Sequence, residues 1–421
     1  MGSFPTIPEW VSLEMRVQEV LTRQELHGWT FNEQAAQELE ITLRKELESL
    51  VEKARQRNPY VPGVEFTPKV HNRIKGYVPG ATFTKVHQFN PSSREHIAWA
   101  MQKKGWKPTV FTDTGKPSID EVVLKDIGTE EALEYFRILE LTKLLGMLNQ
   151  GQNAWLRLVT PKGRIHHHCS VNTHTHRCAH RKPNLAQIPD NQDFLSLFTA
   201  SPGLVMVGAD LAGIELRMLA HYLSRYDNGR YADILVNGDI HQVNAQKIGI
   251  SRKAVKTVTY AFLYGAGDVK IGQSFDQQLS DKEAKKKGAE IRAAYIAAID
   301  GLGELLRDIK LASGRGYVKA IDGRRINVDA QHKALNYLLQ SSAAVIAKRW
   351  MVDVEEIAFH KFDAHQLAFI HDAIFYECTP EKAEDMKFLI EYSAALAGES
   401  YHMRCPVSAT GKVGANLAET H

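Results

Sequence analysis

The chain has 421 residues, of which 44% are hydrophobic and 24% are charged, and its formal net charge is +3. This length suffices for two or three subdomains with sizeable cores, and so small a net charge does not by itself indicate a nucleic-acid partner. No apolar run approaches the length of a membrane span, the N-terminus lacks a secretory signal pattern, and the four cysteines include no C-x-x-C pair, so we expect a cytoplasmic chain with reduced thiols.

The N-terminal third is predicted to be mainly helical. Residues 9–57 carry apolar side chains at helical spacing among many charged ones. Residues 58–92 hold five prolines and show little periodicity, which predicts a long loop or linker. The helical pattern returns at residues 93–150, and residues 154–175 are predicted to form short strands and turns.

The rest of the chain alternates helices with apolar strands. Two predicted strands end at an aspartate: residues 203–210 end at Asp210, and residues 367–372 end at Asp372 before a tight turn into residues 374–377. Periodicity predicts the other elements, which are helices at 214–226, across most of 239–312 and at 331–360, and a hairpin at 314–328.

Charge is unevenly distributed along the chain. Between Lys53 and Lys85, seven cationic residues stand against one acidic residue, so this N-terminal surface could follow a phosphate backbone. From Asp353 to Glu399, eleven acidic residues stand against three lysines. For this second region we expect an ordinary solvated face.

Residues 251–265 predict an amphipathic helix, capped by Ser251 and stopped at Gly265. An apolar stripe of Val255, Val258 and Phe262 can face a core. Two cations followed by two aromatic rings suit a ligand with a polyphosphate at one end and a flat base at the other, although a solvated helix is the simpler alternative. These four side chains recur every fourth residue and are Arg252, Lys256, Tyr260 and Tyr264.

The two strand-end aspartates suggest a site for divalent cations. If the strands that end at Asp210 and Asp372 are neighbours in one sheet, the two carboxylates converge and repel each other. Two Mg²⁺ ions about 4 Å apart are the usual means of in-line phosphoryl displacement. Each aspartate taken alone could instead cap a strand or a helix.

Three segments together resemble the family A DNA polymerases. Asp210–Arg217 resembles motif A of that family, Arg252–Gly265 resembles motif B, and His371-Asp372 resembles the start of motif C. The pattern is similar in particular to that of the replicative polymerases of short-tailed phages, and it covers nearly the whole chain in the expected order. Further matching segments are residues 26–29, 89–94, 183–189, 238–241, 339–344 and 411–414.

The resemblance implies an α+β right-hand architecture in which an antiparallel palm sheet carries Asp210 and Asp372. It also implies template-directed 5′–3′ DNA synthesis from deoxynucleoside triphosphates, with two Mg²⁺ ions that Mn²⁺ can replace. Two other interpretations are a DNA-binding protein with a degraded site and a single-subunit RNA polymerase. The expected segments are an N-terminal extension at 1–8, thumb and connecting region at 9–159, first palm part at 160–222, fingers at 223–335 and second palm part at 336–421.

The resemblance assigns roles at the nucleotide site. Asp210, Asp372 and the Leu211 carbonyl would hold the metals. Arg252, His241 and Lys256 would contact the triphosphate, and Lys256 would act in catalysis by neutralising charge as pyrophosphate leaves. The side chains expected at the sugar and the base pair are Glu215, which would exclude a 2′-hydroxyl, Tyr260, which goes with acceptance of dideoxynucleotides, and Tyr264, near the templating base.

The DNA partner would be a primer–template. Amide and cationic donors in its minor groove can test base pairing without reading sequence, because every correct pair offers acceptors there at equivalent places. The residues that match this role are Arg177, Asn336, Gln340 and His371. We expect the chain to be monomeric, to work with a replisome helicase or primase, and to act in the host cytoplasm if it is encoded by a phage.

The chain departs from the family pattern in several places. Ala373 stands where motif C usually has Glu, and Glu377 lies too far along the strand to replace it, so activity should survive with altered metal affinity. The chain begins almost at thumb-like sequence, so we expect no proofreading exonuclease in it. Residues 58–88 are much shorter than the insertion that binds a processivity factor in the phage relatives, so we do not expect such a factor to be used in the same way.

Histidines and cysteines are concentrated in residues 166–180, which is unusual for the family. The side chains in question are His166, His167, His168, Cys169, His174, His176, Cys178 and His180. Such side chains are good Zn²⁺ ligands, but their spacing matches no standard zinc site. Coincidence or DNA contact is therefore the favoured interpretation, and zinc is the alternative.

Overall fold

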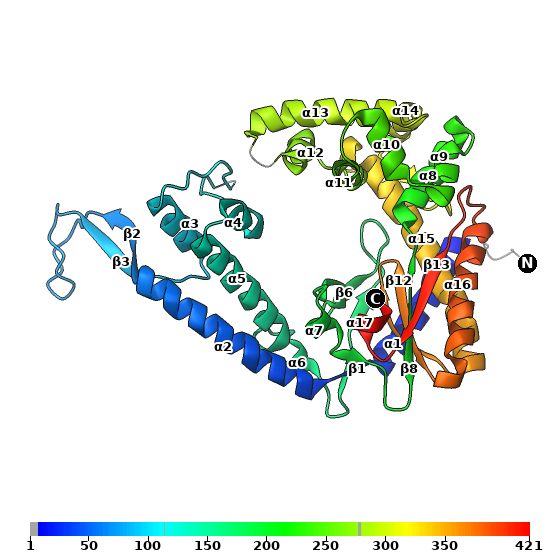
Figure 1. The fold of residues 1–421 in the computed structure, drawn as a ribbon, viewed down its shortest axis with the longest axis horizontal. Coiled ribbons are helices and arrows are strands. Elements are labelled where there is room, and N and C mark those ends of the chain that lie inside the picture. Colours follow the sequence, from blue (N-terminus) through cyan, green and yellow to red (C-terminus); the bar gives the residue numbers. More distant parts are fainter. Residues whose placement is uncertain (1–6, 113, 277–278) are drawn as a thin grey trace, which may run out of the picture. The chain divides into compact units, whose positions relative to one another are not determined.

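The computed structural model describes residues 7–112, 114–276 and 279–421, and these form two compact units (Figure 1). The helical unit is Gln34–Arg157, and the sheet unit combines the segment up to Glu33 with Leu158–His421. The expected thumb segment 9–159 and the helical unit begin at different residues, because helix α1 (Glu9–His27) packs against strand β11 (His365–Ile370) of the sheet unit. In the described ranges no helix is both long and apolar enough to cross a membrane.

The helical unit contains amphipathic helices and one hairpin. The prediction of a loop over 58–92 was wrong in part, because β2 (Tyr60–Phe66) and β3 (Phe83–Gln88) pair as antiparallel strands. Their register shifts after Pro62, a residue that has no N–H to donate to a ladder, and most of the side chains are exposed. The helices of this unit are α2 (Glu33–Arg57), α3 (Arg94–Lys103), α4 (Glu121–Ile127), α5 (Glu130–Leu145), which continues as a π-helical turn over Gly146–Gln150, and α6 (Trp155–Leu158).

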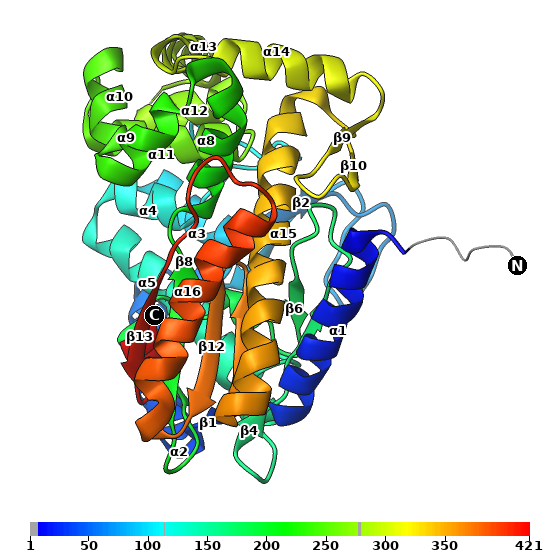
Figure 2. The ribbon, with the colours of Figure 1, turned by 90° about the vertical axis from the view of Figure 1, so that its right-hand side faces the viewer.

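The central sheet of the sheet unit is antiparallel, with the strand order β11-β12-β8-β13. Both predicted aspartate-ended strands belong to it, and the strand beside β8 is β12, the return strand of the β11–β12 hairpin. Figure 2 shows α16 (Ala383–Ser400), α15 (Ala334–Ile357) and α1 side by side over one face of this sheet. The expected α+β class with an antiparallel sheet is therefore confirmed. The three further strands are β8 (Val205–Leu211), β12 (Ala373–Cys378) and β13 (Ala409–Gly414).

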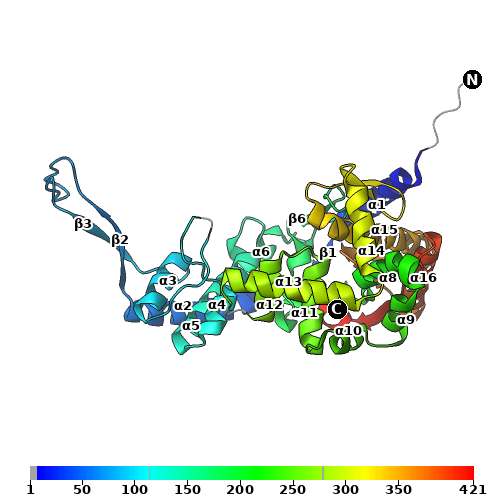
Figure 3. The ribbon, with the colours of Figure 1, turned by 90° about the horizontal axis from the view of Figure 1, so that it is seen from above.

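A group of helices follows β8, and most of them lie where the sequence predicts helices, at 214–226 and across most of 239–312; α9, between these ranges, was not predicted. Helix α8 begins after Gly213, whose φ of 53° lies in the left-handed region that glycine adopts without strain. Helices α12 and α13 pack closely (Figure 3), and a Cβ atom on Gly288 would lie 1.8 Å from the Asp268 carbonyl oxygen. The helices are α8 (Ile214–Asp227), α9 (Arg230–Asn237), α10 (Ile240–Ile248), α11 (Arg252–Leu263), α12 (Asp268–Phe275), α13 (Asp281–Ala298) and α14 (Leu302–Ser313).

Smaller strands complete the sheet unit. The predicted hairpin at 314–328 is present as β9 (Tyr317–Lys319) and β10 (Arg325–Asn327). The other short strands are β1 (Trp29–Phe31), which pairs with β4 (Arg164–Ile165) and β7 (Phe198–Thr199), and the hairpin of β5 (His168–Ser170) and β6 (Ala179–Arg181).

Candidate active site

The two strand-end aspartates lie at the same edge of the central sheet. Asp210 occupies the penultimate position of β8, and Asp372 lies in the turn that joins β11 to β12. Ala373, the first residue of β12, pairs directly with Asp210, and the Leu211 N–H donates to the Asp372 carbonyl oxygen at 2.9 Å. The sheet register thus brings together two carboxylates that are about 160 positions apart in the sequence.

The local electrostatics favour binding of a cation. Burial, together with the negative charges of Asp210 and Glu215, raises the pKa of Asp372 to about 7, against the opposing effect of Arg177. The pKa of Asp210 is also raised, first by burial and then by Glu215, while His421 lowers it. Carboxylates that repel each other in this way form an all-oxygen donor set that suits a hard divalent cation.

These carboxylates line a pocket of about 510 Å³. Its wall also contains Lys412 and His421 from the C-terminal segment, and the Lys412 ammonium donates to the His421 carbonyl at 2.5 Å. Sequence reasoning assigned no role to either residue, although Lys412 lies in the matching segment 411–414. The signal that could have found them is the pairing of β13 with β8, which requires the tertiary fold.

Helix α11 has the two faces that the sequence predicts. The Ser251 hydroxyl accepts from the Ala254 N–H and caps the helix, while Val255, Val258 and Phe262 are buried in the core. On the opposite face, Arg252 and Lys256 are exposed. The Arg252 guanidinium donates from Nε to Asp239 at 2.7 Å, so it is held beside the N-terminus of α10, where Asp239 is the cap.

The aromatic part of the stripe meets Glu215. The rings of Tyr260 and Tyr264 are nearly parallel, at 22°, with centroids 6.4 Å apart, and the ring of His241 lies 6.3 Å from that of Tyr260. Burial and then the negative charge of the nearby Glu215 raise the pKa of Tyr260, and Glu215 accepts a hydrogen bond from the hydroxyl of Tyr264 at 3.4 Å. Arg177 also donates to Glu215, so this carboxylate joins α8, α11 and the β5–β6 loop.

The four residues expected at the DNA minor groove lie on three elements. Asn336 and Gln340 lie one turn apart on α15, and the Asn336 amide donates to the Leu263 carbonyl at 2.8 Å, at the end of α11. His371 lies in the β11–β12 turn with a φ of 58°, next to Asp372. Arg177 lies between β5 and β6.

Glu377 lies away from the strand-end carboxylates, as predicted. It accepts from His27 at 2.6 Å, from the Ser201 N–H at 2.8 Å and from Arg164 at 3.2 Å. Although burial alone would raise the pKa of Glu377, these donors lower it to about 2. Glu377 pairs with Met206 in the β8–β12 ladder, four positions along from the pairing of Ala373 with Asp210, which agrees with the predicted distance from the two aspartates.

The histidine- and cysteine-rich segment separates into two groups. His167, Cys169 and His180 come together in the interior, and their arrangement is described below. The other four histidines have different neighbours: His166 and His168 contact Glu25, His174 contacts Tyr337, and His176 contacts Ser341.

Comparisons with known proteins agree with this geometry. Residues 65–419 match DNA polymerase family A. The chain is 34% identical to the DNA-directed DNA polymerase of Enterobacteria phage T3 and 33% identical to that of Escherichia phage T7, in each case over 98% of this chain and 70% of the relative. Its fold is similar to that of the POL domain of Pol1 from M. smegmatis, which was solved in complex with DNA primer-template and dNTP (TM-score 0.78, 21% identity, 97% of this chain and 70% of that chain).

Proposed function

This chain belongs to DNA polymerase family A and is a template-directed DNA polymerase, and we propose that the carboxylate pocket and α11 together form its nucleotidyl-transfer site. The observation that carries the proposal is the pairing of Ala373 with Asp210, which joins motif A to motif C at one sheet edge. In the proposed reaction the primer 3′-oxygen attacks the α-phosphate of a dNTP, a new phosphodiester bond forms, and pyrophosphate leaves.

Polymerases of this family use divalent metal, and we propose that Asp210, Asp372 and the Leu211 carbonyl would hold two Mg²⁺ ions, which Mn²⁺ can replace. The raised pKa of Asp372 supports this assignment, because excess negative charge is what a bound cation would offset. When bound, the ions would activate the attacking oxygen and neutralise charge on the leaving group. The chain itself supplies a rigid pair of carboxylates, fixed by the β8–β12 ladder.

Arg252, Lys256 and His241 would bind the triphosphate. Arg252 and Lys256 are exposed on one face of α11; burial lowers the pKa of His241 on α10, and the two cations lower it as well. To contact a phosphate, Arg252 would exchange its bond with Asp239 for one with the nucleotide. Lys256 would then stabilise the charge that develops on the pyrophosphate.

Glu215, Tyr260 and Tyr264 would surround the sugar and the base. Glu215 would exclude a 2′-hydroxyl, which argues against the alternative of an RNA polymerase. For Tyr260 we expect ready acceptance of dideoxynucleotides, and Tyr260→Phe should lower their incorporation relative to deoxynucleotides. Competition between the two nucleotides in a primer-extension assay measures this ratio, and an unchanged ratio would contradict the role of Tyr260.

Arg177, Asn336, Gln340 and His371 would contact the minor groove of a primer–template. Asn336 would then exchange its bond with the Leu263 carbonyl for one with a base edge, so DNA binding would be coupled to the end of α11. We further propose that the chain is a monomer that works with a replisome helicase or primase, and that it acts in the host cytoplasm if it is phage-encoded.

Primer extension tests the proposal against its alternatives. Wild type should extend a DNA primer with deoxynucleotides and should use ribonucleotides poorly, whereas Asp210→Asn should bind the same DNA without extending it. Asp190→Asn, at the wall of the same pocket, is the matched control and should retain activity. Binding without extension at every Mg²⁺ or Mn²⁺ concentration would favour a DNA-binding protein with a degraded site.

A further inference from the structure

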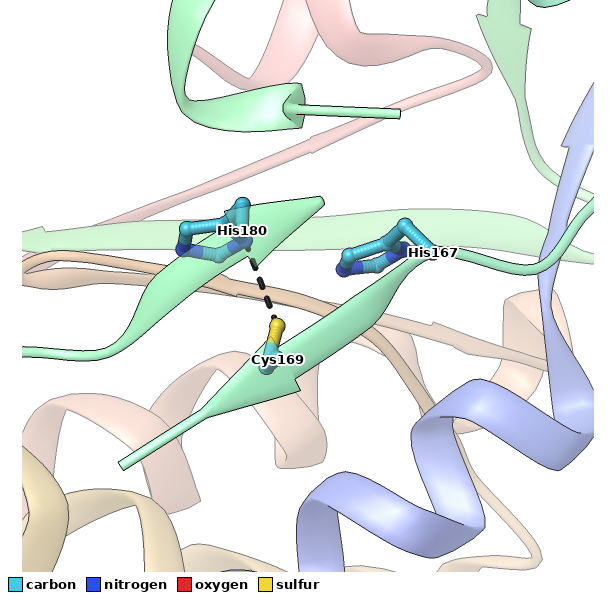
Figure 4. A group of neighbouring side chains, drawn as sticks. All are labelled: His167, Cys169 and His180. Atoms are coloured by element: carbon cyan, nitrogen blue, oxygen red, sulfur yellow. Dashed lines mark hydrogen bonds between the residues drawn. The ribbon is translucent and has the colours of Figure 1, made fainter. Parts of the chain in front are cut away.

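The β5–β6 hairpin brings three metal-ligating side chains together. His167 immediately precedes β5 and Cys169 lies within it, two residues further on, so that extended backbone brings both side chains to the same side. Cys169 pairs directly with His180 on β6, which places His180 on that side as well (Figure 4). The grouping that the sequence spacing did not predict therefore follows from strand alternation and register.

The three side chains form a compact buried cluster. One ring nitrogen of each histidine and the Cys169 sulfur all lie within 4.8 Å of one another. The Cys169 sulfur is 3.2 Å from His180 Nδ1, and His167 Nε2 is 3.0 Å from the Gln24 amide nitrogen on α1. His167 is fully buried, Cys169 is 2% exposed and His180 is 8% exposed, so bulk water does not solvate these groups.

Hydrogen bonds within the protein do not satisfy all the polar atoms of the cluster. His167 Nδ1 and His180 Nε2 are buried and have no hydrogen-bond partner among the described residues. Burial of a polar group without a partner costs about 1 to 3 kcal/mol, so two such atoms on one hairpin make the cluster a poor structural device on its own. Buried imidazole nitrogens and a thiol at this separation suit a borderline-soft metal ion.

We propose that His167, Cys169 and His180 bind a structural zinc ion, separate from the catalytic magnesium site. On binding, the Cys169 thiol releases its proton to solvent and the thiolate sulfur donates to the metal, while the two neutral imidazoles donate through nitrogen. The donor set contains no carboxylate, so Mg²⁺, which prefers oxygen ligands, does not compete for it.

The geometry points to Gln24 as the fourth ligand. Its side chain faces His167 and Cys169 at one end and accepts from the Gln366 amide at 2.8 Å at the other. Beyond Gln366, the single hydroxyl proton of Tyr376 faces two acceptors, at 2.9 Å on Gln366 and at 3.0 Å on Glu355.

When the side-chain amides of Gln24 and Gln366 are both rotated by half a turn, Tyr376, Gln366 and Gln24 each donate one hydrogen bond along this series. Tyr376 then donates to Glu355, Gln366 donates to Tyr376, and Gln24 donates to Gln366. The Gln24 carbonyl oxygen consequently faces the cluster, where it completes a tetrahedral set of two nitrogens, one sulfur and one oxygen.

The proposed zinc would fix a loop that reaches the active site. The turn between β5 and β6 carries Arg177, which donates to Glu215, and His176, which contacts Ser341 on α15. A metal that joins both strands to α1 at the base of this hairpin holds the turn in place. Its role is structural, and none of its ligands contacts the reacting atoms.

Metal analysis of the full chain, purified in buffer that contains Mg²⁺ but no chelator, tests the proposal. Wild type should contain one zinc ion per chain, and Cys169→Ser should contain none above background. Cys178→Ser is the matched control, because Cys178 is buried on the same hairpin segment but lies outside the cluster; it should keep its zinc. Gln24→Ala should bind zinc roughly 10- to 100-fold more weakly, measured by competition with a chromophoric chelator.

Cobalt substitution keeps the test decisive if a variant fails to fold. In wild type and Cys178→Ser, chelator-treated protein loaded with Co²⁺ should show a thiolate-to-cobalt charge-transfer band and the intense visible bands of tetrahedral cobalt. Absence of zinc from wild type after incubation with Zn²⁺, zinc retention by folded Cys169→Ser, or a cobalt spectrum without a thiolate band would each overturn the proposal.

Discussion

Two charged clusters in the sheet unit differ in how their charges are balanced. At the junction of α1, α15 and β10, Glu14 accepts from Lys348 at 2.7 Å and from Arg324, and Arg324 also donates to Asp322 at 2.7 Å. Lys348 and Arg324 are 1% and 4% exposed, and two acids balance two bases. At the active site, by contrast, burial and the negative charge of Glu215 raise the pKa values of Asp210 and Asp372, Asp210 also raises that of Asp372, and Arg177 only partly offsets the effect on Asp372.

The charges of the first cluster stabilise the fold, whereas the excess negative charge of the second is available to bind a ligand. A buried pair is stabilising as long as both partners remain, because loss of one partner leaves the other charge without compensation. The strand-end carboxylates instead destabilise the free protein, and a bound cation would reverse that penalty. Substitutions that remove one carboxylate should therefore have opposite effects on stability in the two clusters.

Asp372→Asn should have the largest effect on activity. Removal of this carboxylate would abolish one predicted metal ligand, and primer extension should fall by roughly 10³-fold or more. The same substitution should raise the free energy of unfolding in the absence of metal, because it removes a half-buried charge that its neighbours repel. Single-turnover extension and urea unfolding in chelator measure the two effects.

The stability part of this prediction has an internal control. Asp363→Asn removes a carboxylate from the same strand hairpin at the far end of β11, away from the cluster. It should leave both activity and stability nearly unchanged. If Asp372→Asn loses as much stability as the removal of a buried paired charge is expected to cost, the carboxylates of both clusters stabilise the free protein.

Glu14→Gln should be the most destabilising of these changes. It leaves Lys348 and Arg324 buried without the carboxylate they share, which should lower the free energy of unfolding by about 3 kcal/mol. Extension activity of the folded fraction should persist, since the network contains no predicted site residue. Urea titration followed by circular dichroism gives the change.

The exposed ion pair between Arg16 and Glu356 supplies the control for Glu14. Glu356→Gln should change the free energy of unfolding by less than about 1 kcal/mol, because solvent screens a surface pair. Equal effects of Glu14→Gln and Glu356→Gln on the free energy of unfolding would mean that burial does not determine how much the Glu14 network contributes to stability.

Sequence periodicity predicted the elements that carry the site, because burial of one face imposes a regular pattern. It identified β8, the β11–β12 hairpin and the buried stripe of α11. It missed the exposed β2–β3 hairpin, whose prolines and exposed side chains leave no alternation to read. The strand β1 also lay inside a segment predicted as helix, after Gly28 with a φ of 72°.

Contacts between distant segments could not be predicted from the sequence. The family resemblance suggested where Glu215 and Asn336 act, but not that the hydroxyl of Tyr264 and the carbonyl of Leu263 are their partners. Spacing likewise argued against a metal site in residues 166–180, because it does not encode strand register. Which residues of the cluster converge depends on the pairing of Cys169 with His180.

The pH dependence of stability should reveal the site carboxylate directly. The pKa of Asp372, about 7, is raised above its unfolded value, so the native state binds this proton more tightly. In chelator, stability should therefore rise as the pH falls through about 7 toward the unfolded pKa of about 4, and the advantage of Asp372→Asn over wild type should shrink in the same window.

The difference between the two proteins isolates Asp372 from other titrating groups. Glu355, whose pKa burial raises to about 7, titrates in both proteins, and so its contribution cancels. Saturating Mg²⁺ should reduce the slope in wild type, because the cation competes with the proton for the same oxygens. A difference that stays constant from pH 8 to 5 would contradict the assignment of the raised pKa to Asp372.

Ala373→Glu should have the smallest effect on primer extension. It tests directly whether excess negative charge at the strand-end carboxylates favours cation binding. Ala373 pairs directly with Asp210, so the new carboxylate begins on the same face, with Cβ atoms about 4.5 to 5.5 Å apart. It adds negative charge to a site that already has an excess, so the metal-free protein should lose stability while the Mg²⁺ concentration for half-maximal extension should fall by less than about tenfold. Ala373→Gln has the same shape without the charge and should leave the Mg²⁺ requirement unchanged. If both variants shift that requirement equally, the side chain acts by filling the pocket, and the cation affinity of this sheet edge is already set by Asp210 and Asp372.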